Sequence, residues 1–348
     1  MQQLTLTRPD DWHLHFRDGE VLRHVLPHTA RRFGRAIVMP NLKPTVTTVE
    51  AALAYRARIH AALPPDCTFT PLMVLYLTDN TPLDEVDRVA ATPGVVAFKY
   101  YPAGATTNSD AGVTDIARVY PLLERMEELG VPFLLHGEVT DHEVDVFDRE
   151  RVFIERIASG LVRRFPRLRL VFEHATTLDA VQFVRAQGPQ VAATLTPQHL
   201  LNNRTDMFRG GLRPHLYCLP VLKREQDREA LLEAATSGNP KFFLGTDSAP
   251  HARHLKEHSC GCAGVFSAHA GIELYAEAFD SVGRLDRLEG FASHFGADWY
   301  GLPRNAGSIT LRRRDHEVPA TLPFPDGELV PYRAGGVLGW EIVDGGCA

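Results

Sequence analysis

Residues 132–137, with the sequence PFLLHG, hold the pattern on which the fold prediction depends. A short run of large apolar side chains ends in a histidine and a glycine. The run lacks the alternation of apolar and polar residues that marks a half-exposed strand, so it predicts a strand buried on both faces, as in a parallel sheet. Seven further runs of this kind raise the number of predicted strands to eight: Leu4–His15, Arg35–Pro40, Phe69–Thr78, Val95–Tyr100, Leu168–His174, Val191–Thr196 and Lys241–Thr246.

Helical segments lie between and after these strands. The clearest is Asp115–Leu129, where apolar residues recur every three or four positions and Gly130 and Pro132 follow. Strands that alternate with helices form either a TIM (β/α)8 barrel or a doubly wound sheet, and eight strands favour the barrel. The same spacing predicts helices at Asp148–Phe165, Thr177–Ala186, Arg224–Ala235, Gly271–Phe279 and Leu288–Trp299.

We expect the chain, residues 1–348, to form a single domain. Barrels of about 250 residues or more commonly fold as one unit. The barrel core should span about residues 4–300. The C-terminal extension, about residues 301–348, is rich in Pro and Gly, and we expect it to wrap around the barrel.

The composition excludes several classes of protein. The chain is 44% hydrophobic and 23% charged, with 43 acidic and 37 basic side chains and a formal net charge of −6, as in ordinary globular proteins. It contains no run of basic residues of the kind that binds nucleic acid. It also contains no run of 18 apolar residues and no apolar signal segment in its first 30 residues. We therefore expect no nucleic-acid partner, no membrane span and no secretion signal.

The five cysteines are thinly spread and do not form the pattern of a disulfide framework. We therefore expect a reducing compartment and a cytoplasmic location. Cys260 and Cys262 form a C-x-C pair, but a structural zinc site needs four ligands and no second pair stands nearby. A cysteine zinc site is therefore not expected.

The ends of the predicted strands carry side chains that bind metals. In a TIM barrel the C-terminal ends of the strands form the active-site face. The first strand ends in His13-Leu14-His15, and residues two apart in a strand point to the same side. Each of these side chains alone also has an ordinary explanation, such as a hydrogen-bonded histidine or an N-cap aspartate. Together they predict a metal site formed by His13, His15, Lys99, His136, His174 and Asp247.

Lys99 is the exception in this set, because an ammonium beside divalent cations is repelled and costly to desolvate. Lys99 either reaches outward to pair with an acid or reacts with CO₂ to form a carbamate, an anionic oxygen donor that can bridge two metals. In the second case His13, His15 and Asp247 would bind the more buried ion, and His136 and His174 the other. Imidazole and carboxylate ligands suit zinc.

Longer motifs give these residues a family context. The series H-x-H, Lys, His, His, Asp resembles the amidohydrolase superfamily. Within it, the chain resembles the dihydroorotase family in its short bacterial and fungal form, from about residue 8 to residue 275 and more loosely to the end. The motifs that carry this resemblance are Asp11–Gly19, Met39–Asn41, Lys99–Ser109, Leu135–Glu138, Glu173–Thr177, Thr196–Leu200, Pro220–Arg224 and Gly245–His251.

The resemblance implies an enzyme that cyclises N-carbamoyl-L-aspartate reversibly to (S)-dihydroorotate and water, the third step of de novo pyrimidine (UMP) biosynthesis. It implies two zinc ions per subunit, a Lys99 carboxylated by CO₂, and a homodimer. The implied nucleophile is a hydroxide that bridges the zinc ions, because metal binding lowers the pKa of water. Asp247 is implied as the general acid and base. The zinc ligands implied are His13, His15, Lys99, His136, His174 and Asp247.

A predicted substrate clamp lies beside the metal site. Arg17 stands two residues past His15, and a guanidinium matches a carboxylate through two parallel hydrogen bonds. The alternatives are a surface ion pair for Arg17 and a turn role for Asn41. By resemblance, the residues that contact the substrate are His15, Arg17, Asn41, His136, Leu219, His251 and Ala263.

The small, polar segment Ala103–Gly112 is either an ordinary flexible loop or, as the resemblance implies, a lid. Thr106 and Thr107 would then reach into the site. Histidines in helical or loop segments are interpreted as surface or packing residues, namely His24, His28, His60, His142 and His294.

Two other functions share some of these features. A hydantoinase or dihydropyrimidinase would have the same metal ring but an uncharged substrate, which Arg17, Asn41 and His251 argue against. A scaffold protein that has lost its metal ligands would keep only the fold, yet all six ligand positions are filled here.

Overall fold

The computed structural model describes residues 2–259 and 261–345. Eight parallel strands, each hydrogen-bonded to the next in chain order, form the central sheet. The backbone N–H of Asp247 donates to the carbonyl of His13 at 2.8 Å, and that of His15 donates to Ser248 at 2.9 Å. These bonds join the first strand to the segment after the last, so the sheet closes into the expected TIM barrel. The strands are β2 (Asp10–Leu14), β3 (Arg35–Val38), β4 (Thr70–Tyr76), β5 (Val95–Tyr100), β6 (Phe133–His136), β7 (Leu170–Glu173), β8 (Val191–Leu195) and β9 (Phe242–Leu244).

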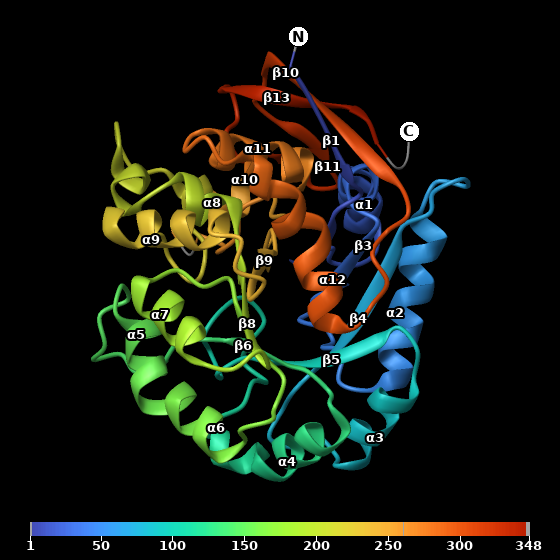
Figure 1. The fold of residues 1–348 in the computed structure, drawn as a ribbon, viewed down its shortest axis with the longest axis vertical. Coiled ribbons are helices and arrows are strands. Elements are labelled where there is room, and N and C mark those ends of the chain that lie inside the picture. Colours follow the sequence, from blue (N-terminus) through green and yellow to red (C-terminus); the bar gives the residue numbers. More distant parts are fainter. Residues whose placement is uncertain (1, 260, 346–348) are drawn as a thin grey trace.

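Helices surround this barrel, and Figure 1 shows α2, α3, α4 and α6 in that order around its outside, with α5 and α7 beyond α6. A large apolar cluster fills the layer between strands and helices. The helices of the first half are α1 (Glu20–Arg32), α2 (Val49–Ala62), α3 (Asp84–Ala91), α4 (Tyr120–Leu129), α5 (Arg149–Phe153) and α6 (Ser159–Arg164). Those of the second half are α7 (Leu178–Ala186), α8 (Pro197–Leu201), α9 (Glu225–Thr236), α10 (Arg253–Lys256), α11 (Gly271–Asp280) and α12 (Phe295–Tyr300).

The predicted helices are all present, three of them with local variation. A 3₁₀ turn precedes α4, and π-helical turns separate α5 from α6 and precede α12. The predicted first strand was wrong in one respect, because Leu4–His15 is two strands that belong to different sheets. The break falls at Arg8 and Pro9, since proline has no N–H to donate to a ladder.

A second sheet combines both ends of the chain. β1 (Gln3–Thr7) pairs antiparallel with β10 (Ser308–Glu317), which pairs antiparallel with β13 (Val337–Asp344). The predicted C-terminal wrap therefore consists largely of strands, including the small hairpin of β11 (Leu322–Phe324) and β12 (Gly327–Leu329). Figure 1 shows this sheet lying to one side of the barrel.

The interior of the barrel is packed, and one end of it is sealed by α12. The ring of Tyr300 stacks on Trp12 with centroids 4.7 Å apart. A Cβ atom added to Gly296 would lie 2.0 Å from Nε1 of Trp12, so only glycine fits there. The opposite, C-terminal end of the barrel is therefore the open mouth. The inward-facing side chains are Trp12, Ile37, Met39, Leu72, Val74, Ala97, Leu134, Val171, Ala192 and Phe243.

No helix within the described residues combines the length and the apolar character that crossing a bilayer requires. Cys218 and Cys262 are free thiols. Cys67 is disulfide-bonded, which departs from the expectation of reduced cysteines. Cys260 of the C-x-C pair lies outside the described residues.

Candidate metal centre and substrate pocket

His13, His15 and Asp247 converge at the mouth of the barrel. Oδ1 of Asp247 lies 3.4 Å from Nε2 of His13 and 3.2 Å from Nε2 of His15. One ligand atom from each residue lies within 4.8 Å of the others. β2 presents both histidines on one side, and the turn after β9 brings Asp247 back over them. This trio has the ligand types and spacing that a divalent cation needs.

Hydrogen bonds fix the free ring nitrogen of each of these histidines. Nδ1 of His13 lies 2.8 Å from Oε2 of Glu173, and Nδ1 of His15 lies 2.8 Å from Oδ1 of Asn41. Both partners are oxygen acceptors, so each Nδ1 carries the hydrogen and donates it. The Nε2 lone pairs are therefore left pointing at Asp247, an arrangement typical of metal-binding histidines.

His136 and His174 form the other half of the cluster, with ring centroids 4.8 Å apart. Nε2 of His136 donates to Oε2 of Glu138 at 2.7 Å, which leaves Nδ1 of His136 as the acceptor. Nδ1 of His174 is buried and has no hydrogen-bond partner. A buried polar nitrogen without a partner is costly, and a bound cation would satisfy it.

Lys99 lies beneath these rings, fully buried at the end of β5. Its Nζ has no hydrogen-bond partner and lies 5.1 Å from the ring centroid of Tyr101. Burial lowers the pKa of Lys99 to about 8. The outward, acid-paired alternative for Lys99 is therefore absent from this structure. With this pKa a minor fraction of the side chain is the neutral amine near neutral pH, and that form reacts with CO₂.

The protonation states of the cluster suit a cation. Burial alone would raise the pKa of Asp247, but the close contacts of its carboxylate with the rings of His13 and His15 hold that pKa well below its ordinary value. Burial lowers the pKa of His15 to about 4, and burial together with the nearby Lys99 lowers that of His174 strongly. His15 and His174 are therefore neutral imidazoles beside an ionised carboxylate, which are forms that bind metals. At His13 the effect of burial is outweighed by the neighbouring Glu173 carboxylate, which raises the pKa of that ring.

Backbone strain accompanies the cluster. Arg17, His174 and Asp247 have φ values of 64°, 40° and 47°, in the left-handed region that side chains other than glycine rarely occupy. Such a conformation costs about 1–3 kcal/mol per residue and concentrates at functional sites. The strained backbone therefore lowers the stability of the fold, and it directs these side chains into the mouth of the barrel.

Arg17 and His251 lie together on one wall of the mouth. Nη2 of Arg17 is 3.0 Å from Nε2 of His251. The same Nε2 is 2.9 Å from the carbonyl oxygen of Ala263, so it can accept from Arg17 or donate to Ala263 but cannot do both. The Arg17 guanidinium is partly buried and has no carboxylate partner among the described residues, unlike the surface ion pair considered as an alternative.

The predicted lid segment covers the cavity. Thr106 and Thr107 line it, and the Oγ1 of Thr107 donates to the carbonyl of Ala263 at 3.5 Å. Asn41 donates from Nδ2 to the carbonyl of Thr107 at 3.0 Å. One cavity thus collects most of the predicted site residues, with Lys99 and His251 just behind its wall. Its lining is His13, His15, Arg17, Asn41, Tyr101, Thr106, Thr107, His136, His174, Leu219, Asp247, Ala249, Ala263 and Gly264.

The sequence did not identify the residues that support the ligands. Glu138 orients the ring of His136, and Glu173 orients the ring of His13. Each acid stands within two positions of a predicted ligand, but the sequence analysis did not select either one. Asp11 accepts from the backbone N–H of Thr246 at 2.9 Å and from its hydroxyl at 2.5 Å, which anchors the turn that carries Asp247. Burial raises the pKa of Asp11 to about 7.

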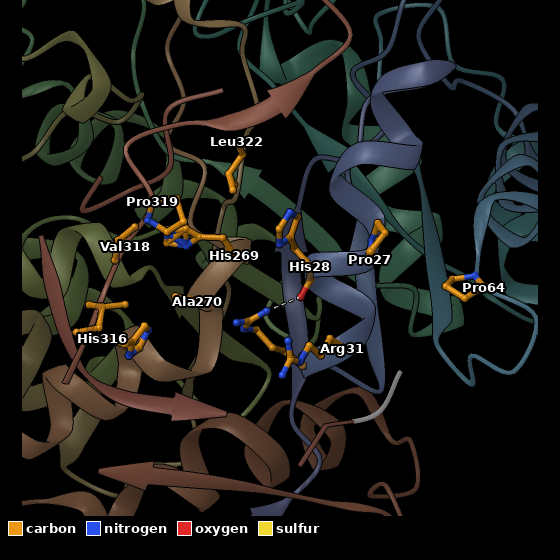
Figure 2. A pocket seen from close by; sticks show the side chains of 12 residues that line it. Pro27, His28, Arg31, Pro64, His269, Ala270, His316, Val318, Pro319 and Leu322 are labelled. Atoms are coloured by element: carbon orange, nitrogen blue, oxygen red, sulfur yellow. Dashed lines mark hydrogen bonds between the residues drawn. The ribbon is translucent and has the colours of Figure 1, made fainter. Parts of the chain in front are cut away.

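The other histidines lie away from this cavity. His24, His60 and His142 are exposed, and His294 is half-buried, as expected. His28 lines a separate cavity between α1 and the C-terminal strands. Figure 2 shows it there with His269 and His316. None of these histidines belongs to the converging trio of metal-ligand types found among the described residues.

Comparison with known proteins places the chain in a family. Residues 10–313 match the model of the amidohydrolase family. A dihydroorotase of Azoarcus sp. (strain BH72) is 64% identical over 343 residues, which cover 98% of this chain and 100% of that protein. A crystal structure of dihydroorotase from Campylobacter jejuni superposes with a TM-score of 0.90 at 36% identity, covering 98% of this chain and 97% of that one. Dihydroorotase from Saccharomyces cerevisiae, solved with 5-fluoroorotic acid, gives a TM-score of 0.90 at 32% identity, covering 98% of each chain. The barrel with its histidine-lined mouth therefore belongs to the amidohydrolase family and, within it, to the dihydroorotases.

Proposed function

We propose that this chain interconverts N-carbamoyl-L-aspartate and (S)-dihydroorotate, with the ring amide as the bond that forms and breaks, as a step of pyrimidine biosynthesis. The observation that carries the proposal is the presence, in one cavity, of a cluster of metal-ligand types and a partly buried guanidinium without a carboxylate partner among the described residues. The cluster of metal-ligand types suits hydrolysis of an amide. The guanidinium suits a substrate that keeps a carboxylate outside the reacting bond.

The cluster fits two zinc ions with a carboxylated Lys99. The unpartnered Nζ of Lys99 and Nδ1 of His174 are the buried atoms that such a centre would satisfy. His13, His15 and Asp247 would hold one ion, His136 and His174 would hold the other, and the carboxylated Lys99 would supply further oxygen ligands. When bound, the ions would make water a competent nucleophile near neutral pH and polarise the amide carbonyl.

The residues of the chain move the proton and hold the substrate. In hydrolysis, the Asp247 carboxylate takes the proton of the attacking water and passes it to the ring nitrogen that leaves; in cyclisation it does the reverse. Arg17, Asn41 and His251 bind the substrate carboxylate, and the backbone at Leu219 and Ala263 contacts the ring. His15 and His136 border the same space.

Turnover on dihydroorotate compared with hydantoin tests this function. We expect measurable hydrolysis of dihydroorotate and little of hydantoin, because an uncharged ring leaves the Arg17 guanidinium in the cavity without a partner. Faster turnover of hydantoin would favour the hydantoinase alternative. Absence of both activities in zinc-loaded protein would revive the scaffold alternative.

Arg17→Met should lower kcat/KM for dihydroorotate by about 10²-fold, because truncating one member of a desolvated charge pair costs roughly 2–5 kcal/mol. Most of the loss should appear as a higher KM. Arg23→Met, an exposed position on α1, is the matched control and should behave as the wild type. Equal KM values in both variants would argue against the clamp.

Thr107→Val should lower turnover by about tenfold while zinc content stays unchanged. Valine keeps the shape of the side chain but removes the hydroxyl that bonds Ala263 across the cavity, a loss of about 1 kcal/mol or more. Steady-state kinetics and metal analysis on the same sample check this. Unchanged turnover would indicate that Ala103–Gly112 is an ordinary loop rather than a lid.

We further propose a cytoplasmic homodimer whose subunit, residues 1–348, unfolds as one domain. The family resemblance supports the dimer. Sedimentation equilibrium would test the oligomeric state, and a single calorimetric transition with equal calorimetric and van't Hoff enthalpies would support one domain.

A further inference from the structure

Lys256, the last residue of α10, is buried, and within the described residues its ammonium bonds only to backbone. Its Nζ donates to the carbonyl oxygens of Tyr217 at 3.0 Å, Cys262 at 2.8 Å and Gly264 at 2.6 Å. All three ammonium hydrogens are thus used, and none of the three acceptors is a carboxylate. Burial lowers the pKa of Lys256 to about 8, so the charged form prevails at neutral pH. An ammonium placed this way ties separate stretches of backbone together.

The stretches that it joins form one wall of the substrate cavity. Tyr217 lies two residues before Leu219, and Cys262 and Gly264 flank Ala263; Leu219, Ala263 and Gly264 line the cavity. The N–H of Gly264 also donates to the carbonyl of Tyr217 at 3.0 Å. The position of Lys256 therefore determines the distance between the two backbone segments that face the substrate ring.

This wall is closely packed. Gly264 has a φ of 151°, and a Cβ atom there would lie 2.8 Å from Cβ of Ala249 and 2.9 Å from Cδ2 of His251. The carbonyl of Ala263 contacts both His251 and Thr107. A shift of this wall would therefore displace His251 of the carboxylate clamp and Thr107 of the proposed lid.

We propose that Lys256 is a positioning residue that sets substrate affinity without touching the substrate, by holding the backbone of Leu219 and Ala263 at the spacing the ring requires. This inference rests on the proposed function, because that function assigns these two residues to the ring. Lys256 contacts none of the proposed metal ligands. Removal of the Lys256 ammonium should therefore weaken substrate binding and leave metal binding unchanged.

The chain offers a matched control in Lys241. Its Nζ likewise donates to three backbone carbonyls, those of Val184, Arg185 and Gln187, at 2.6, 3.1 and 2.8 Å. Lys241 directly precedes β9, so it lies at the N-terminal end of the barrel, away from the mouth. Lys241→Met removes the same chemistry at a place where no effect on the substrate is expected.

The test compares Lys256→Met with Lys241→Met in the zinc-loaded enzyme, by thermal unfolding, zinc content, kcat and KM for dihydroorotate. Both variants should unfold at lower temperature and keep their zinc. Only Lys256→Met should raise KM, by about tenfold or more, which corresponds to about 1.4 kcal/mol of binding free energy, with kcat changed less than KM. Lys256→Gln, which retains two N–H donors, should show an intermediate KM.

An unchanged KM in folded Lys256→Met, or an equal rise of KM in both methionine variants, would overturn the proposal and leave Lys256 a purely structural residue. If Lys256→Met does not fold, an unchanged KM in Lys256→Gln overturns it equally. A wild type without dihydroorotate turnover would instead refute the proposed function. The two failures are therefore distinguishable.

Discussion

Lys99→Ala should leave a folded barrel that retains less zinc and turns over dihydroorotate at least about 10³-fold more slowly, a loss typical of removing one member of a unit that acts together. Lys99 is fully buried without a partner for its Nζ, so its contribution to stability as an amine is small. Its proposed carbamate, in contrast, would supply oxygen ligands to the metal centre. Metal analysis, thermal unfolding and cyclisation of N-carbamoyl-L-aspartate on one preparation check the three parts of this result.

A short carboxylic acid provides the control for that variant. The alanine leaves space beneath the histidine rings, and acetate or propionate supplies the oxygens that the carbamate would have offered. We expect either acid to restore part of the activity of Lys99→Ala and to leave the wild type unaffected. Wild-type activity in Lys99→Ala without added acid would exclude a catalytic role for this lysine.

Asp247→Asn should lower kcat by at least about 10³-fold, because an amide cannot take up and release a proton as a carboxylate does. Oδ1 of Asp247 lies within 3.4 Å of both His13 and His15, and asparagine keeps an oxygen at that place. Zinc binding should therefore suffer less than turnover, and KM should change little.

The matched control for Asp247→Asn is Asp11→Asn, which alters a buried acid that holds the same turn but does not face the cavity. We expect its main effect on thermal stability. If Asp247→Asn loses zinc and activity in equal measure, Asp247 is a ligand alone and the proton transfer belongs to another group.

Much of the barrel was predictable because its strands are buried on both faces, and continuous apolar runs mark them in the sequence. The helices α1, α2 and α3 were not singled out, although the alternation of elements implied helices there. The pairing of β1 with β10 could not be foreseen, since it joins residues some 300 positions apart, for example Leu6 with Ile309. Leu4–His15 was predicted as one strand, although Arg8, Pro9, Asp10 and Asp11 interrupt its apolar residues where one sheet ends and the next begins.

The convergence of the predicted site residues at the mouth of the barrel could be foreseen, because each predicted ligand stands at a strand end and the end determines where it lies. What could not be predicted is which acid supports which histidine. Glu173 is adjacent in sequence to His174, yet it bonds His13, 160 positions away. Strand order in the closed barrel brings them together, and residue spacing alone contains no such information.

The left-handed backbone of Arg17, His174 and Asp247 has a consequence for protein engineering. A screen for heat resistance alone would reward glycine at these three positions, because glycine adopts positive φ without steric cost. The most heat-resistant variants from such a screen would then fold as barrels but have no enzymatic activity. Selection for durability in this molecule therefore has to be coupled, in every round, to a screen for chemistry.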